Sequence, residues 1–351
     1  MTKTLSSSAS SKYKIITRTA EFVSLGHPDK ICDILSDYIL DLYLAKDPQA
    51  RVAVEIMGGH GELNVCGEVT SKAKINIVKK LQQKLGNNIR IHSNLVQQSP
   101  EISRGVDAGG AGDQGIMVGY ACAENPHLLP TEYVLARDLC QKIYSEFPYD
   151  GKTQVAVDIK YDQKHHFVSA EIKHIVVSWQ NVSTKRLCAE LTIWLNNILI
   201  PNITVSEKLK VSINPAGDWN IGGFDADTGL TGRKIVVDAY GPRVPVGGGA
   251  FSGKDPSKVD RSAAYMAREI AKDYLQKRHA NEVYVYIAYA LGEVQPIDAT
   301  VIIDGEVERI KDYNLSPRAI IERLKLLQPN YEQRAKWGHF AWQYAKIDAW
   351  I

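Results

Sequence analysis

A glycine-rich segment at residues 247–261, GGGAFSGKDPSKVDR, holds the side chains best suited to bind a charged ligand. Small residues let backbone N–H groups converge on an anion, and Lys254 and Lys258 add two positive charges. Asp260 is a hard oxygen ligand of the kind that Mg²⁺ takes alongside phosphates. The alternative is a loop that only turns a corner, but the density of charge disfavours it. The segment is not a Walker A loop, because Asp255 stands where that motif has Ser or Thr.

Two further groups combine glycine with a carboxylate. In GHPDK, residues 26–30, His27 would act as a donor and Asp29 as a Mg²⁺ ligand at the start of a helix. The structural alternative makes His27 the helix cap and Asp29 a partner of the helix dipole. In GAGDQG, residues 110–115, the carboxylate is Asp113, and by itself this composition indicates no more than a turn.

The fourth group is DTGLTGRK at residues 227–234. Arg233 can hold phosphate by its planar fork and Lys234 as a point charge, although a solvated basic pair before a strand has the same composition. Upstream, Trp219 offers a flat face to a purine, although a lone Trp more often belongs to a core. Because the four groups lie far apart in sequence, we expect a composite pocket around a highly charged anion that carries metal.

Other classes of protein have little support. The sequence lacks GxSxG, HExxH and a GxGxxG that follows a strand, which disfavours hydrolase, zinc-protease and Rossmann interpretations. In its 351 residues, 42 Lys and Arg face 40 Asp and Glu, and the net charge of +2 argues against a nucleic-acid binder. No apolar stretch approaches the roughly 20 residues of a membrane span, and five scattered cysteines suit reduced thiols. We therefore expect a cytoplasmic protein that binds neither nucleic acid nor membranes.

The elements that must position these groups alternate along the chain. Hydrophobic periodicity predicts helices after Pro28 and at 72–85, 132–146, 183–198, 257–276 and 317–326. It predicts strands at 51–56, 62–69, 116–122, 154–161, 167–179, 234–237, 282–291 and 299–303. Asp255 and Ser257 are candidates for the N-cap of the fifth helix. Residues 1–11 are predicted to be a disordered tail. The three groups of strands, each with helices, predict an α+β protein with three similar domains, each a sheet with helices on one face.

The four motifs, in this order and from about Glu21 to His339, resemble the S-adenosylmethionine synthetase (methionine adenosyltransferase) family. The resemblance implies an SN2 reaction in which the sulfur of L-methionine attacks C5′ of ATP, and the tripolyphosphate is then hydrolysed to pyrophosphate and phosphate. It implies two Mg²⁺ per active site and K⁺ as ions. It also implies a pseudo-threefold arrangement of the three domains and active sites at the interface of a homodimer, which can pair into a homotetramer.

Matching positions carry the family's site residues onto this chain. The positions implied to bind ATP and its polyphosphate are His27, Lys152, Trp219, Asp227, Arg233, Lys234, Ala250 and Lys254. Those implied to be catalytic are His27, Lys152, Arg233 and Lys254. Those implied to face methionine or adenosine are Glu68, Gln98, Asp113, Asp227 and Lys258. The metal ligands would be Asp29 and Asp260 for Mg²⁺ and Glu55 for K⁺.

We expect an N-terminal domain at residues 12–100, a short gating loop at 101–112, a central domain at 113–220 and a C-terminal domain at 221–351. Leu25 stands where the family usually has Glu, and residues 98–113 are shorter than the family's gate. Two alternatives remain open from the residues. One is an ATP-dependent phosphotransferase or nucleotide hydrolase with the same cationic pocket, which would release ADP. The other is a regulatory subunit that binds nucleotide without turnover.

Overall fold

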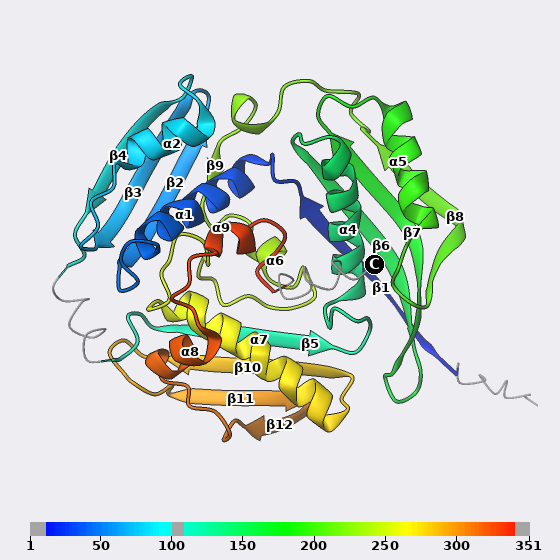
Figure 1. The fold of residues 1–351 in the computed structure, drawn as a ribbon. Helices are drawn as coiled ribbons and strands as arrows, with labels where there is room; N and C mark the ends of the chain where they lie inside the picture. The colour runs from blue at the N-terminus through cyan, green and yellow to red at the C-terminus, as the bar shows by residue number, and fades with distance from the viewer. Residues whose placement is uncertain (1–11, 100–108, 341–351) are drawn as a thin grey trace, which may run out of the picture.

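The computed structural model describes residues 12–99 and 109–340. Three four-stranded sheets surround a common centre, and a long helix covers the inward face of each sheet (Figure 1). The predicted α+β fold with three domains is confirmed. The predicted tail at 1–11 and most of the predicted gate at 101–112 lie outside the described residues.

The first sheet has the strand order β1-β6-β7-β8. Its strands are β1 (Lys14–Val23), β6 (Gly151–Tyr161), β7 (Phe167–Trp179) and β8 (Ile203–Ile213). Helix α4 (Thr131–Glu146) packs on β1 and β6, and α5 (Thr184–Asn196) packs on β8 and α4. β1 runs antiparallel to β6, and the pairing of Val23 with Lys152 places the start of β6 beside the segment that leads into α1.

The second sheet has the order β4-β3-β2-β9. Its strands are β2 (Arg51–Gly59), β3 (Glu62–Thr70), β4 (Arg90–Val96) and β9 (Gly229–Leu230), with helices α1 (Pro28–Leu44) and α2 (Ile77–Leu85). Val52, Val54 and Ile56 of β2 are buried on the face that packs against α1. Because side chains alternate between the faces of a strand, Glu55 lies on the opposite, exposed face. We call this opposite face the outer face of the second sheet.

The third sheet has the order β12-β11-β10-β5. Its strands are β5 (Gly115–Cys122), β10 (Glu282–Tyr289), β11 (Asp298–Ile303) and β12 (Glu306–Arg309), with helices α7 (Val259–Arg278) and α8 (Pro317–Leu324). Gly119 lets β5 approach α7 closely, because a Cβ atom there would lie 2.1 Å from the carbonyl oxygen of Ala267. The short elements η1 (Gly223–Asp225), α6 (Ile235–Asp238) and α9 (Tyr331–Arg334) complete the described chain, and α6 and α9 lie near the centre (Figure 1).

Each sheet takes strands from distant parts of the chain. β1 pairs with a strand of the central region, β5 pairs with a strand near the C-terminus, and β9 joins the N-terminal sheet. Each sheet therefore contains strands from two of the domains whose boundaries are expected at residues 100, 112 and 220. This exchange of strands ties the three units together.

Two local predictions are wrong. Residues 234–237 were expected to form a strand, but Ile235–Asp238 form helix α6, and the Asp238 N–H donates to the carbonyl of Lys234. So short an apolar run has no periodicity that distinguishes the two structures. Neither Asp255 nor Ser257 caps α7, whose N-cap is Lys258. The Asp255 carboxylate instead accepts the N–H groups of Val52 and Ser257, at 2.6 and 2.8 Å.

Among the residues that the structure describes, none of the helices combines the length and the apolar character that crossing a membrane requires.

Candidate active site

The first group of charged side chains surrounds the amino end of α1. We call it the α1 group, and it consists of His27, Asp29, Lys152, Asp227, Arg233 and Lys234. His27 is the N-cap of α1, and its Nδ1 accepts the N–H of Asp29 at 3.2 Å. Pro28 fills the first helical position, where an N–H would have no partner within the helix. Residues from α1, from β6 and from the segment after η1 thus converge on one point.

Asp29 joins α1 to the two cations of the fourth motif. Its carboxylate accepts from Lys234 Nζ at 2.6 Å, lies 3.4 Å from Arg233 Nε and accepts the Leu230 N–H at 2.9 Å. Burial favours a higher pKa for Asp29, but these hydrogen bonds and positive charges outweigh it and lower the pKa. The Asp29 carboxylate is therefore ionised, and it offers hard oxygen donors among neighbours that are mainly positively charged.

His27 is uncharged at neutral pH. Burial of the ring and the positive charges of Lys234 and Lys152 lower its pKa to about 4. Since Nδ1 accepts a hydrogen bond, the single proton of the neutral ring lies on Nε2. His27 can therefore donate one hydrogen bond to an anionic ligand without adding a charge.

The second group stands at the amino end of α7. We call it the α7 group, and it consists of Lys254, Asp255, Lys258 and Asp260. Lys254 Nζ lies 2.5 Å from Asp260 Oδ2, and Lys258 pairs with Asp255. The loop that carries Lys254 runs along β2, where Lys254 forms a bridge with Ala53. Gly253 is required at this point, because a Cβ atom there would lie 1.9 Å from the carbonyl oxygen of Val54.

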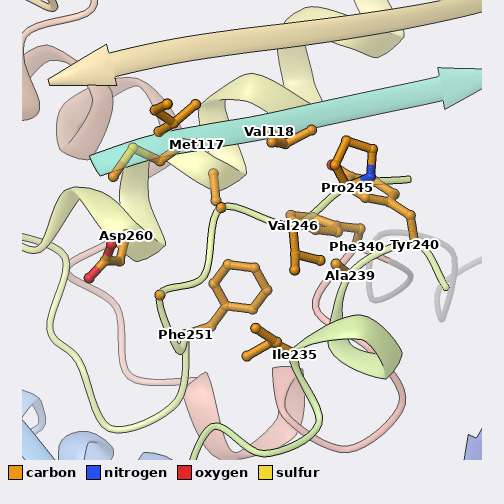
Figure 2. Close-up of a pocket in the computed structure, with 14 residues that line it drawn as sticks. Met117, Val118, Ile235, Ala239, Tyr240, Pro245, Val246, Phe251, Asp260 and Phe340 are labelled. Atoms are coloured by element: carbon orange, nitrogen blue, oxygen red, sulfur yellow. The ribbon is translucent and has the colours of Figure 1, made fainter. Parts of the chain in front are cut away.

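Asp260 lies at one side of a small, mainly apolar pocket. Figure 2 shows its carboxylate apart from the rings of Tyr240 and Phe340, which line the other side. Gly249 also lines the pocket, and a Cβ atom added to it would lie 2.4 Å from Asp260 Oδ1. The glycine-rich loop therefore keeps side chains away from this carboxylate oxygen, as binding of a ligand or metal requires.

Glu55 and Glu68 share the outer face of the second sheet with Lys254. Ala53 of β2 stands opposite Glu68 of β3 and also opposite Lys254, and directly paired residues point to the same face. Glu55 follows Ala53 by two residues and therefore points the same way. Both glutamates are exposed. The outer face thus presents two carboxylates beside one cation of the α7 group.

The other predicted residues are dispersed. Gln98 and Asp113 stand on either side of the stretch 100–108, and the Gln98 Oε1 atom is buried with no hydrogen-bond partner within the described chain. Trp219 is half-buried against Gly222, where a Cβ atom would lie 2.8 Å from the indole ring. Ala250 lies against Gly232, the residue before Arg233.

Within the described residues, the two groups remain separate and no metal site is complete. No hydrogen bond or ion pair joins a charged side chain of the α1 group to one of the α7 group. The described part of the chain also holds no cluster of three or more His, Cys, Asp or Glu that could bind a metal. With His27 neutral, the α1 group has one net positive charge and the α7 group has none.

The ion pairs that hold these groups in place are buried, and the four motifs do not indicate them. Lys30 is fully buried and pairs with both Asp33 and Asp238, and Arg261 is fully buried and pairs with Asp37. Burial raises the pKa of Asp37, although Arg261 opposes this effect. The signal that would have found them is the recurrence of Asp every four residues along the first helix.

Comparison with known proteins identifies the family to which the chain belongs. The chain matches three family models, the N-terminal, central and C-terminal domains of S-adenosylmethionine synthetase, at residues 15–101, 108–219 and 221–350. It is 39% identical over 359 residues to the S-adenosylmethionine synthase of Salinibacter ruber, with 92% of each chain covered. It is 41% identical over 357 residues to that of Myxococcus xanthus, with 92% of this chain and 89% of the relative covered. The chain therefore belongs to the S-adenosylmethionine synthetase family.

Proposed function

We propose that this protein makes S-adenosyl-L-methionine from L-methionine and ATP. The observation that carries the proposal is the convergence of Lys152, Arg233 and Lys234 on His27 and Asp29, in a chain whose relatives are named S-adenosylmethionine synthases. In the proposed reaction the methionine sulfur forms a bond to C5′ of ATP, and the bond from C5′ to oxygen breaks. The leaving tripolyphosphate is then hydrolysed to pyrophosphate and phosphate.

The protein's part in this reaction is positioning and electrostatic stabilisation. Negative charge grows on the leaving tripolyphosphate, and Lys152, Arg233, Lys234 and Lys254 stabilise it. Ion pairs with carboxylates hold the last three in place before the reaction. His27 donates its Nε2 proton as a hydrogen bond to the same anion. No side chain acts as a nucleophile, because sulfur itself attacks and only needs to be held in line with C5′.

We also propose that the working site forms between two copies of the chain. The α1 group alone carries one net positive charge, which is too little to balance a tripolyphosphate. In a homodimer, the α1 group of one copy meets the α7 group and the outer face of the second sheet of the other. On that face Met57 is 44% exposed and Cys66 is also exposed. Exposed apolar side chains support the burial of this face in an interface. The family resemblance implies that two such dimers can pair into a tetramer.

The residues fit the ions that the family resemblance implies. The carboxylates of Asp29 and Asp260 offer the hard oxygen donors that Mg²⁺ prefers, and one carboxylate comes from each group. Mg²⁺ held by these carboxylates would supply positive charge beside the leaving phosphates. Glu55 on the outer face is the proposed ligand of K⁺.

We assign the remaining residues to the binding of methionine and adenosine. Glu68, Gln98 and Asp113 supply acceptors for the methionine ammonium, and Lys258 supplies a cation for its carboxylate. Asp227 lies near both substrates, while Trp219 and Ala250 face the adenosine. We further propose a cytoplasmic location, in keeping with five cysteines that are all free thiols.

The test is to incubate the protein with ATP, Mg²⁺ and K⁺, with and without methionine, and to separate the products by chromatography. S-adenosylmethionine, pyrophosphate and phosphate should form only when methionine is present. ADP as the product would select the phosphotransferase or hydrolase alternative. Binding of ATP with no product would select the regulatory subunit.

A further inference from the structure

Helix α1 carries an aspartate at every fourth position, and we call Asp29, Asp33, Asp37 and Asp41 the aspartate row. Residues four apart in a helix lie almost above one another, because four residues rotate by only about 40° beyond a full turn. They therefore form one ridge on the helix surface. Each carboxylate of the row accepts at least one backbone N–H from a segment that lies 199 to 291 residues later in the chain. One helix therefore fixes the backbone of three distant segments.

Asp33 fixes the segment that carries Arg233. Its Oδ1 accepts the N–H of Gly232, the preceding residue, at 2.8 Å, and its Oδ2 accepts from Lys30 Nζ at 3.0 Å. Lys30 also pairs with Asp238, the last residue of α6. The two cations of the fourth motif, Arg233 and its neighbour, are thus held between two points anchored to α1.

Asp37 does the same for Lys254. Its Oδ1 accepts the N–H of Gly253, again the residue immediately before a cation, at 2.8 Å. Arg261 binds both oxygens of Asp37, at 2.7 and 2.5 Å, and also donates to the carbonyl of Lys254 at 2.9 Å. Both loops therefore have the same arrangement. An aspartate of α1 accepts the backbone N–H of the residue before a cation, and a buried basic residue pairs with that aspartate.

We propose that Asp33 and Asp37 are positioning residues that set the cations of the α1 and α7 groups from one rigid helix. Both side chains are 0% exposed, so they cannot touch a substrate and act only through the loops. The inference depends on the proposed function for the roles of Arg233 and Lys254. Small displacements of groups that must be preorganised are costly, since a 1 Å error can reduce a rate about a hundredfold.

The test compares Asp33→Asn and Asp37→Asn with Asp41→Asn, which is a matched control. Asp41 belongs to the same row and accepts two amides, those of Tyr331 and Glu332, both at 2.9 Å, but these residues have no proposed role in the site. At a temperature where all the variants are folded, kcat should fall roughly ten- to hundredfold in Asp33→Asn and Asp37→Asn, with the KM for methionine nearly unchanged. Asp41→Asn should lower the melting temperature but retain the wild-type kcat.

A second readout does not depend on activity. Peptides that contain Gly232 should lose protection from amide hydrogen exchange in Asp33→Asn, and those that contain Gly253 in Asp37→Asn. Wild-type kcat in both variants, an equal loss of kcat in Asp41→Asn, or unchanged exchange would each overturn the inference. If the wild-type protein makes no S-adenosylmethionine, the proposed function fails, and hydrogen exchange alone decides whether the row sets the loops.

Discussion

At the scale of single residues, the site depends on groups whose charge is set by their neighbours. Burial and adjacent lysines keep His27 neutral, and Lys234 with Arg233 keeps Asp29 ionised. Lys254 is held 2.5 Å from Asp260, although both must serve ligands in the proposed reaction. Asp29, Lys254 and Asp260 are thus prepared for a polyphosphate and its metal by ion pairs that these ligands would replace.

Replacing Lys254 with Ala should lower kcat by about a hundredfold or more, because it removes a charge that stabilises the leaving polyphosphate. Steady-state assays with ATP and methionine measure this effect. Lys164→Ala, at an exposed lysine in the turn between β6 and β7, is the matched control and should retain full activity. A near-normal rate for Lys254→Ala would show that this residue lies outside the active site.

At the scale of elements, close packing of helices on sheets holds the loops that carry the charges. α7 lies directly on β5, and this contact fixes the amino end of the helix, where Lys258 and Asp260 stand. The absence of a side chain at Gly119 makes the contact this close. Periodicity predicted both elements, because each is long enough to show its repeat. It could not predict β9, which has only two residues and exists through its pairing with β2.

Gly119→Ala should therefore destabilise the fold by about 1–3 kcal/mol or more, because the added Cβ would lie 2.1 Å from the carbonyl oxygen of Ala267. Urea unfolding followed by circular dichroism measures this change. Gly115→Ala is the control on the same strand, since its Cβ would meet only the flexible end of Met117 at 3.1 Å and Asp260 at 3.6 Å. Equal stability of the two variants would contradict the packing argument.

At the scale of the whole molecule, a buried centre joins the three units. His339 is fully buried there, and its Nδ1 lies 2.7 Å from the hydroxyl of Tyr265. The backbone N–H of His339 donates to the carbonyl of Asp238. Burial and the charges of Arg261, Lys30 and Arg334 lower the pKa of His339 well below 6.5. The unfolded chain therefore binds a proton at mildly acidic pH that the folded chain excludes.

The contribution of His339 to stability should be complete above pH 6.5 and should decrease as the pH falls below it. Between pH 7.5 and 5.5 the free energy of unfolding should decrease by on the order of 1 kcal/mol from this residue. His339→Asn should reduce the pH dependence by that amount in urea unfolding experiments, whereas His92→Asn on exposed β4 should not. An unchanged pH dependence in His339→Asn would show that the histidine is not held neutral.

The family resemblance, the α+β class and the residues that carry charge can all be predicted from the amino-acid sequence, because the motifs and the long periodic elements are local properties. Which strands share a sheet, and which cations share a group, depends on contacts between distant parts of the folded chain. The carboxylates of Asp29, Asp33 and Asp37 bind amides about 200 residues away, and no local pattern encodes such a pairing. The helical form of residues 235–238 has the same origin. Its N-cap residue Lys234 pairs with Asp29 of α1, and its last residue Asp238 pairs with Lys30 of α1.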